Sequence, residues 1–220
     1  MRFTREVTET SELYVDGRGN KEEIDVFPGV PLDNPLAGNV IDLCPVGALL
    51  DKDFLFAQRV WFLKSTPSID GLTAGGDNIR VDHNEGKVYR IKPRTNPAVN
   101  AWWISDEVRY GWKHVHSDQR LTAPLRRQHG VLIADDYNRV YRAAAEGLTK
   151  AASEGKRLGL LVSPHLSCEE AFALAQLARS IDEHAVLGVG PVRIEGEDQT
   201  FPPSAEPGSE NSYTKRAEKA

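Results

Sequence analysis

Thiols are scarce in this sequence of 220 residues, which has two cysteines, Cys44 and Cys168, and one methionine. Two cysteines are too few for a disulfide framework, and a single bridge between them is disfavoured in a reducing compartment. Cys168 lies where a helix is predicted to begin, so the simplest interpretation is a helix-start residue or a small buried hydrophobe.

Long apolar runs and basic stripes are missing as well. No run reaches the roughly 18 apolar residues that a membrane-spanning helix needs, so we expect no direct membrane insertion. The N-terminal stretch MRFTREVTETSELYV lacks the apolar core of a secretory signal. A formal net charge of −5, without a basic stripe that carries aromatic residues, predicts no nucleic-acid binding.

Turn-forming residues dominate the first 57 positions, for example Asp16-Gly17, Pro28-Gly29 and Asp33-Asn34-Pro35. They interrupt any long periodicity and predict an irregular, loop-rich segment with a short helix near Thr4–Thr10. Such a segment buries little core of its own, so a partner or a metal ion has to order it.

Residues 58–116 have the pattern of a small antiparallel β domain with one helix. Arg59–Leu63 is predicted to be a strand, and Asn78–Arg94 a hairpin whose turn is His83–Gly86. Gly86 can adopt the left-handed conformation that ends a three-residue loop. A short helix is predicted over Asp106–Val115.

Residues 117–195 change to an α/β pattern. Asp135 or Asp136 can cap a helix that Gly155 closes. Two short apolar runs, Arg157–Ser163 and Ala185–Val189, are typical of buried parallel strands.

Ser167 and Glu170 form a capping box at the start of a helix between those two runs. The order strand, helix, strand predicts a βαβ unit, and two strands are too few to stand alone. Residues 196–220 are polar and rich in proline, so we expect a disordered tail with no element beyond about Thr200.

One string carries a specific resemblance: Gly38-Asn39-Val40-Ile41-Asp42-Leu43-Cys44-Pro45-Val46-Gly47-Ala48-Leu49. It resembles the Cys-Pro-Val-Gly-Ala-Leu segment of the large iron–sulfur subunit, of the 75 kDa type, of respiratory NADH:quinone oxidoreductase (complex I). The resemblance continues through Arg59–Lys64, Asn78–Asp82 and Trp103–Glu107. It is strong over residues 1 to about 125 and weaker beyond.

The resemblance implies that Cys44 is the fourth ligand of a [4Fe–4S] cluster, whose other three ligands come from an upstream Cys-x-x-Cys-x-x-Cys run. In the family, a segment similar to Met1–Val7 follows the last of these three cysteines directly. On this interpretation the chain begins just after them, and Cys44 is the single remaining ligand of a cluster held in the longer family protein.

Residues 58–116 resemble the small iron–sulfur domain that opens molybdopterin oxidoreductases. The positions that match its four cluster cysteines are Asp70, Thr73, Asp77 and Ser105. Because these side chains offer hard oxygen atoms in place of thiolates, we expect no cluster in this domain. A different metal held by Asp70 and Asp77 is an alternative, although no histidine or glutamate lies beside them at ligand spacing.

Residues 117–195 resemble the start of the molybdopterin-oxidoreductase α/β domain, for which we expect no molybdenum cofactor. The predicted fold class is α+β. It combines a ferredoxin-like cluster segment (1–57), a β domain without cluster cysteines (58–116), an incomplete α/β unit (117–195) and a tail (196–220).

The implied function is electron transfer through iron–sulfur clusters from NADH toward quinone, with no catalytic site in this chain. The expected partners are other peripheral-arm subunits of complex I, in the cytoplasm at the inner face of the respiratory membrane. The isolated chain is expected to be redox-inactive. The alternatives are a non-redox structural or truncated remnant that docks in the complex, and a formate-dehydrogenase-like iron–sulfur subunit.

Overall fold

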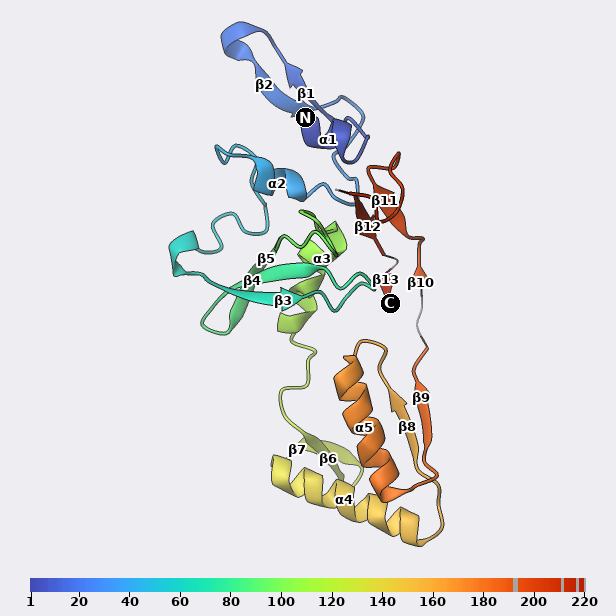
Figure 1. Cartoon of the computed structure of the whole chain (residues 1–220). Coiled ribbons are helices and arrows are strands. Elements are labelled where there is room, and N and C mark those ends of the chain that lie inside the picture. The colour runs from blue at the N-terminus through green and yellow to red at the C-terminus, as the bar shows by residue number, and fades with distance from the viewer. Residues whose placement is uncertain (192–193, 211, 217, 220) are drawn as a thin grey trace. The chain divides into compact units, whose positions relative to one another are not determined.

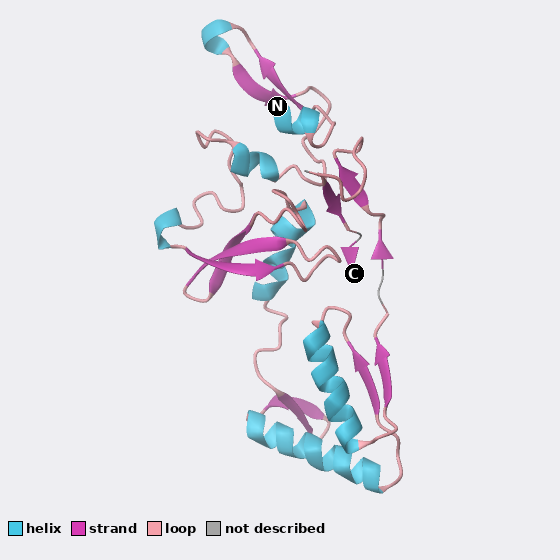
Figure 2. Ribbon diagram, viewed as in Figure 1, coloured by secondary structure: helices cyan, strands magenta, loops and turns pink. Residues whose placement is uncertain are grey.

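The computed structural model describes residues 1–191, 194–210, 212–216 and 218–219. The chain forms two compact units (Figure 1): Met1–His116 with Ile194–Ala220, and Ser117–Arg193. Both contain helices and strands, so the fold is α+β (Figure 2). No helix among the described residues is long and apolar enough to cross a bilayer.

The N-terminal segment of the first unit contains more regular structure than the turn-rich sequence predicts. Its helix, α1, covers Arg2–Glu6 and so begins and ends earlier than expected. Strands β1 (Leu13–Asp16) and β2 (Glu23–Val26) form an antiparallel hairpin around the 3-10 helix η1 (Gly19–Lys21). The short helix α2 (Asn39–Leu43) follows and ends at the cysteine.

A three-stranded antiparallel sheet of β3 (Lys64–Ile69), β4 (Asn78–Asn84) and β5 (Lys87–Pro93) forms the middle of this unit, with β4 at its centre. The predicted strand over Arg59–Leu63 is wrong. Val60–Phe62 is the 3-10 helix η2, and pairing with β4 begins only at Lys64, opposite His83. Because β4 ends at Asn84, it offers almost no partner for residues before Lys64.

The predicted hairpin of β4 and β5 is confirmed, but its loop has two residues and not three. Asn84 pairs with Lys87, and Glu85 and Gly86 both have positive φ angles, 47° and 77°. A turn with two left-handed residues matches the twist of a hairpin. The register shifts between Asp82, which pairs with Arg90, and His83, which pairs with Val88. Tyr89 is therefore the extra residue of a β-bulge.

The helix predicted over Asp106–Val115 is shorter in the structure. The α-helix α3 covers Asp106–Tyr110, and the 3-10 helix η3 continues it over Gly111–His116. One hydrophobic cluster joins the sheet to α3 and to the residue just before its N-cap: Ile79, Ile91, Val108 and Ile104.

The expectation of a disordered tail without elements beyond about Thr200 is wrong for the described residues. β11 (Gln199–Phe201) pairs with β12 (Tyr213–Lys215), and β10 (Ile194–Glu195) pairs with β13 (Glu218–Lys219), both antiparallel. Phe201 and Tyr213 are buried in a core with apolar residues of the N-terminal segment: Phe3, Leu13, Leu36 and Val40. This polar sequence is ordered because two aromatic rings complete a core that lies far away along the chain.

The second unit opens with a hairpin of β6 (Leu125–Gln128) and β7 (Val131–Ala134), which the sequence patterns did not predict. Helix α4 (Tyr137–Ser153) follows, with Asp136 as its N-cap. Gly155, just past its end, has a φ of 72°, as a helix-closing glycine requires.

The predicted βαβ unit is confirmed: β8 (Gly159–Val162) and β9 (Val186–Val189) are parallel, with α5 (Cys168–Ile181) between them. The capping box of Ser167 and Glu170 and the place of Cys168 at the helix start are confirmed too. The strands, however, are not buried. Val186 and Val189 are 62% and 64% exposed, because two strands and one helix layer cannot cover both faces of a sheet.

Candidate metal centre

Cys44 lies at the C-cap of α2, at the start of a tight turn whose backbone N–H groups face its sulfur. The Leu49 N–H is 3.5 Å from Sγ. Donation by Leu49 is the main cause of a lowered pKa of the Cys44 thiol, and burial opposes it. Further N–H donors of the turn act in the same direction: Val46, Ala48 and Gly47.

This arrangement fits a metal-bound thiolate. N–H groups directed at a sulfur stabilise its charged form, which is the form that ligates iron, and hydrogen bonds to sulfur also tune the potential of iron–sulfur clusters. A [4Fe–4S] cluster needs four such ligands. The second thiol of the chain, Cys168, is exposed on α5 in the other unit, so residues 1–220 supply one candidate ligand and not a set.

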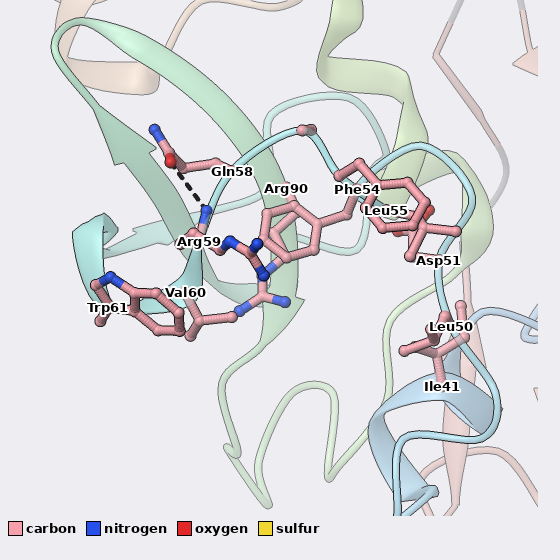
Figure 3. Close-up of a pocket in the computed structure, with 12 residues that line it drawn as sticks. Ile41, Leu50, Asp51, Phe54, Leu55, Gln58, Arg59, Val60, Trp61 and Arg90 are labelled. Carbon is pink, nitrogen blue, oxygen red and sulfur yellow. Dashed lines mark hydrogen bonds between the residues drawn. The ribbon is translucent and has the colours of Figure 1, made fainter.

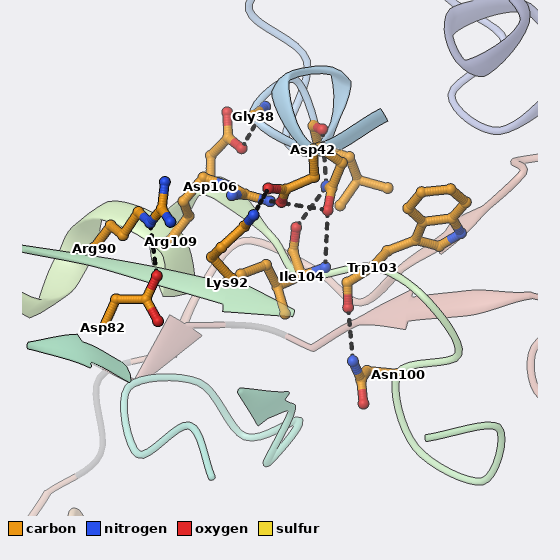
Figure 4. A network of polar contacts seen from close by, with 12 residues as sticks. Gly38, Asp42, Asp82, Arg90, Lys92, Asn100, Trp103, Ile104, Asp106 and Arg109 are labelled. Atoms are coloured by element: carbon orange, nitrogen blue, oxygen red, sulfur yellow. Dashed lines mark hydrogen bonds and ion pairs between the residues drawn. The ribbon is translucent and has the colours of Figure 1, made fainter. Parts of the chain in front are cut away.

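A buried polar network fixes the helix that ends at Cys44 (Figure 4). Asn39 donates to the Ile104 carbonyl at 2.8 Å and accepts from the Ile104 N–H at 3.3 Å. The Arg109 guanidinium donates to Asn39 Oδ1 at 3.1 Å and to Asp42 Oδ2 at 2.8 Å. Lys92 on β5 lies 3.0 Å from the other Asp42 oxygen. These contacts join α2 to α3 and to the sheet.

Gly38, just before α2, allows the close approach of α3. Its N–H donates to Asp106 Oδ1 at 2.9 Å, and a Cβ atom here would lie 2.5 Å from Arg109 Cδ. Burial is the main cause that raises the pKa of Asp106 to about 6, while the Gly38 N–H and Arg109 favour the charged form. No residue other than glycine fits without moving Arg109.

Sequence reasoning missed Asn39, Asp42, Lys92 and Arg109 as site residues. The partners of Asn39 and Arg109 are 65 to 70 positions away in the chain, so no local spacing links them. The one available signal is the presence of an asparagine within the apolar string that precedes Cys44.

A hollow of about 630 Å³ lies beside α2 (Figure 3). Ile41 from α2 lines it together with the segment after Leu50, and Arg90 places its guanidinium 4.2 Å from the centre of the Phe54 ring. Phe56 and Trp61 on its rim are 93% and 73% exposed. No cysteine or histidine is among the described residues that line the hollow.

The four positions that match cluster cysteines, Asp70, Thr73, Asp77 and Ser105, are all buried, with at most 7% exposed. Asp70 and Thr73 lie at the turn between β3 and β4, where Asp70 accepts from the Thr73 N–H and from its hydroxyl, at 2.9 and 2.5 Å. Asp77 lies at the end of that turn, just before β4. Ser105 caps α3, accepting from the Val108 N–H.

The hydrogen-bond partner of Asp77 is a phenol from the end of the chain. Tyr213 Oη donates to Asp77 Oδ2 at 2.7 Å, and both residues are 2% exposed. Burial is the main cause that raises the pKa of Asp77 to about 6. Burial and Asp77 together raise the pKa of Tyr213, against hydrogen bonding from Ser105. Oxygen side chains that are bonded to one another, with a phenol among them, do not fit a [4Fe–4S] cluster.

The histidines near the end of η3 form contacts of their own. His114 Nδ1 is 2.8 Å from the Gly111 carbonyl, and His116 Nε2 accepts from the Val88 N–H. Across the described part of the chain, no group of three or more histidine, cysteine, aspartate or glutamate side chains is placed to hold a metal ion.

Two families match the first unit. The family of the ferredoxin-like domain of NADH-quinone oxidoreductase subunit 3 matches residues 1–50, which include Cys44. The family of the NADH-ubiquinone oxidoreductase NDSU1/NuoG-like 4Fe-4S domain matches residues 63–113, which include the four oxygen positions.

Whole proteins match across most of the chain. The 78 kDa subunit of mitochondrial NADH-ubiquinone oxidoreductase from Neurospora crassa is 37% identical over 181 residues, 82% of this chain and 24% of that protein. A subunit of the NADH-quinone oxidoreductase of Streptomyces coelicolor is 35% identical over 179 residues, 81% of this chain and 21% of that protein.

The 75 kDa subunit of NADH-ubiquinone oxidoreductase from Reclinomonas americana is 36% identical over 161 residues, 73% of this chain and 23% of that protein. The chain thus spans about a quarter of the length of the curated relatives it matches. Two domain families in the expected order, and relatives of one kind across about four fifths of the sequence, agree with the resemblance carried by the Cys44 string. The chain belongs to the family of 75/78 kDa, NuoG-like iron–sulfur subunits of NADH:quinone oxidoreductase.

Proposed function

We propose that this chain is part of an electron-transfer subunit of complex I, and that Cys44 is one of four thiolate ligands of a [4Fe–4S] cluster. The observation that carries the proposal is the group of backbone N–H donors around Cys44 Sγ, in a turn that lies within the matched ferredoxin-like segment. A bound cluster supplies a one-electron relay between NADH and quinone. The chain itself carries out no substrate chemistry.

The remaining ligands of that cluster come, on this proposal, from residues outside these 220. Two thiols in the whole sequence cannot complete a set of four, and Cys168 belongs to the other unit. The chain's own contribution is to hold Cys44 and to orient its sulfur. Asn39, Asp42 and Arg109 do this by fixing α2 against the sheet domain.

The proposal extends to the finer architecture and to partners. Residues 58–116 would be the cluster-less form of a molybdopterin-oxidoreductase iron–sulfur domain, and residues 117–195 the start of the α/β domain that follows it. Other peripheral-arm subunits of complex I are the proposed partners, at the inner face of the respiratory membrane. The exposed apolar strands of the second unit support a neighbour that covers them.

The formate-dehydrogenase-like alternative is less well supported. It requires electron flow through a cluster at Asp70, Thr73, Asp77 and Ser105, whose oxygen atoms suit iron–sulfur chemistry poorly. The structural alternative, a subunit that docks without redox activity, makes a different prediction about iron and can be tested beside the main proposal.

The test is affinity purification of the tagged chain from its native cells under anaerobic conditions, followed by EPR spectroscopy after reduction with NADH. We expect co-purification with complex I subunits, and loss of one [4Fe–4S] signal in Cys44→Ala but not in Cys168→Ala. Identical spectra for both variants would refute the ligand role. Co-purification with complex I subunits, together with [4Fe–4S] signals that Cys44→Ala does not change, would favour the structural alternative.

A further inference from the structure

We propose that the strand pair β11–β12 fills the site lined by the oxygen side chains of Asp70, Thr73, Asp77 and Ser105, and we call this strand pair the plug. Tyr213 on β12 occupies the space in which a cysteine-bearing form of this domain would hold metal. The plug takes over the ordering role of a cluster. This inference is independent of Cys44, because it concerns a different site and needs no iron.

The geometry of Tyr213 carries the proposal. Its hydroxyl donates to Asp77 at 2.7 Å, and Ser105, another of the four oxygen positions, is buried as well. These three residues are each at most 2% exposed, although Tyr213 is 136 positions from Asp77 in the chain. Buried carboxylates are costly unless they are bonded, so Tyr213 provides what Asp77 needs.

The turn around the site closes tightly on these oxygen atoms. Asp70 accepts from the N–H groups of Leu72 and Thr73, both at 2.9 Å, and its own N–H donates to the Asp77 carbonyl at 2.8 Å. A Cβ atom at Gly75 would lie 3.1 Å from Asp77 Oδ1. The turn is therefore packed around side-chain oxygens, and the Tyr213 hydroxyl lies among them.

Contacts from both strands hold the β11–β12 pair in place on the first unit. Lys215 Nζ lies 2.9 Å from Glu107 Oε1 on α3. Phe201 on β11 stacks on Tyr213, with ring centres 6.5 Å apart and an angle of 24° between the ring planes. The same two rings pack against Phe3 and Leu36 of the N-terminal segment. The strand pair thus contacts both the N-terminal segment, through Phe3 and Leu36, and the sheet domain, through Asp77 and Glu107.

The first experiment measures hydrogen exchange of the full chain with and without the phenol hydroxyl. In Tyr213→Phe we expect the amides of residues 70–78 to exchange at least ten-fold faster, because Asp77 loses its donor and the turn loosens. Tyr14→Phe, on β1 where the ring packs on Phe27, is the matched control and should leave those amides unchanged. Unchanged exchange in Tyr213→Phe would overturn the plug.

The second experiment tests the space itself. Asp70, Thr73, Asp77 and Ser105 are all replaced by cysteine, either with Tyr213 kept or with Tyr213→Gly added, and both proteins are reconstituted anaerobically with iron and sulfide. Circular dichroism first confirms that each is folded. After one-electron reduction with dithionite, we expect a stoichiometric [4Fe–4S] EPR signal only in the protein that also carries Tyr213→Gly. A full signal while Tyr213 is present, or in neither folded protein, would overturn the proposal.

Discussion

Arg109 on α3 donates a hydrogen bond of 2.8 Å to Asp42, two positions before Cys44 on the helix that ends there. Its side chain is 4% exposed, and it also bonds Asn39. A single buried cation therefore connects the sheet domain to the segment that presents the proposed iron ligand.

Removal of that cation should destabilise the first unit and loosen α2. We expect Arg109→Ala to lower the free energy of unfolding by about 3 kcal/mol, because Asp42 and Asn39 lose a buried partner. All four tryptophans, Trp61, Trp102, Trp103 and Trp112, belong to this unit, so their fluorescence during urea unfolding reports on it alone.

The matched control for Arg109 is Arg2→Ala, which removes an ion pair with Glu6 whose arginine is 87% exposed. Exposed pairs contribute at most about 1 kcal/mol. Equal losses in the two variants would show that the buried network is not what holds α2.

Close packing at Gly38 leads to a second expectation. Gly38→Ala places a methyl group against Arg109 and Asp106, and overpacking of this kind costs about 1–3 kcal/mol. Gly71→Ala is the control, since nothing lies within 4 Å of a Cβ atom there and its φ is not positive. Thermal unfolding followed by tryptophan fluorescence should separate the two; a Gly38→Ala protein as stable as Gly71→Ala would contradict the close approach.

Asp77 should make the stability of the first unit depend on pH. Its folded pKa is raised to about 6, above an unfolded value of about 3.9, so its stabilising contribution is full below about pH 4 and is lost as the pH rises through 6. Asp70 and the Tyr213 hydroxyl are the titratable groups that face it. Asp77→Asn keeps an acceptor for Tyr213 but carries no charge, so it should remove this loss.

We therefore expect Asp77→Asn to be more stable than the native chain by about 1–3 kcal/mol at pH 7.5, and the difference to shrink toward zero as the pH falls below about 4. The measurement is urea unfolding at several pH values, always as native minus variant, so that other titrations cancel. A difference that does not change with pH would rule out the buried, protonated carboxyl.

The thiol of Cys44 should react as a thiolate at lower pH than an unstructured cysteine, because N–H donation from its turn lowers the pKa. Mass spectrometry of iodoacetamide-treated Cys168→Ser protein between about pH 6 and 9 gives the rate at Cys44 alone. N-acetylcysteine is the reference thiol. A pH profile that coincides with the reference would mean that the turn does not stabilise the thiolate.

Local patterns predicted the elements that depend on neighbours in sequence. The β4–β5 hairpin, the capping box of Ser167 and Glu170, and the βαβ unit all follow from alternation, capping residues and apolar runs within short stretches. The strand assigned to Arg59–Leu63 failed for the opposite reason, since a strand exists only where a partner is available, and β4 pairs from Lys64 onward.

The sequence by itself determined which side chains could bind a metal: one thiol in a Cys-Pro-Val-Gly-Ala-Leu turn, and oxygen side chains at the positions where a related domain has cysteines. What only the tertiary structure decided is which groups meet. The contacts of Tyr213 with Asp77 and of Arg109 with Asn39 join residues 136 and 70 positions apart. Such pairs leave no periodic trace in a sequence, because burial in a shared core brings them together, and local conformation does not.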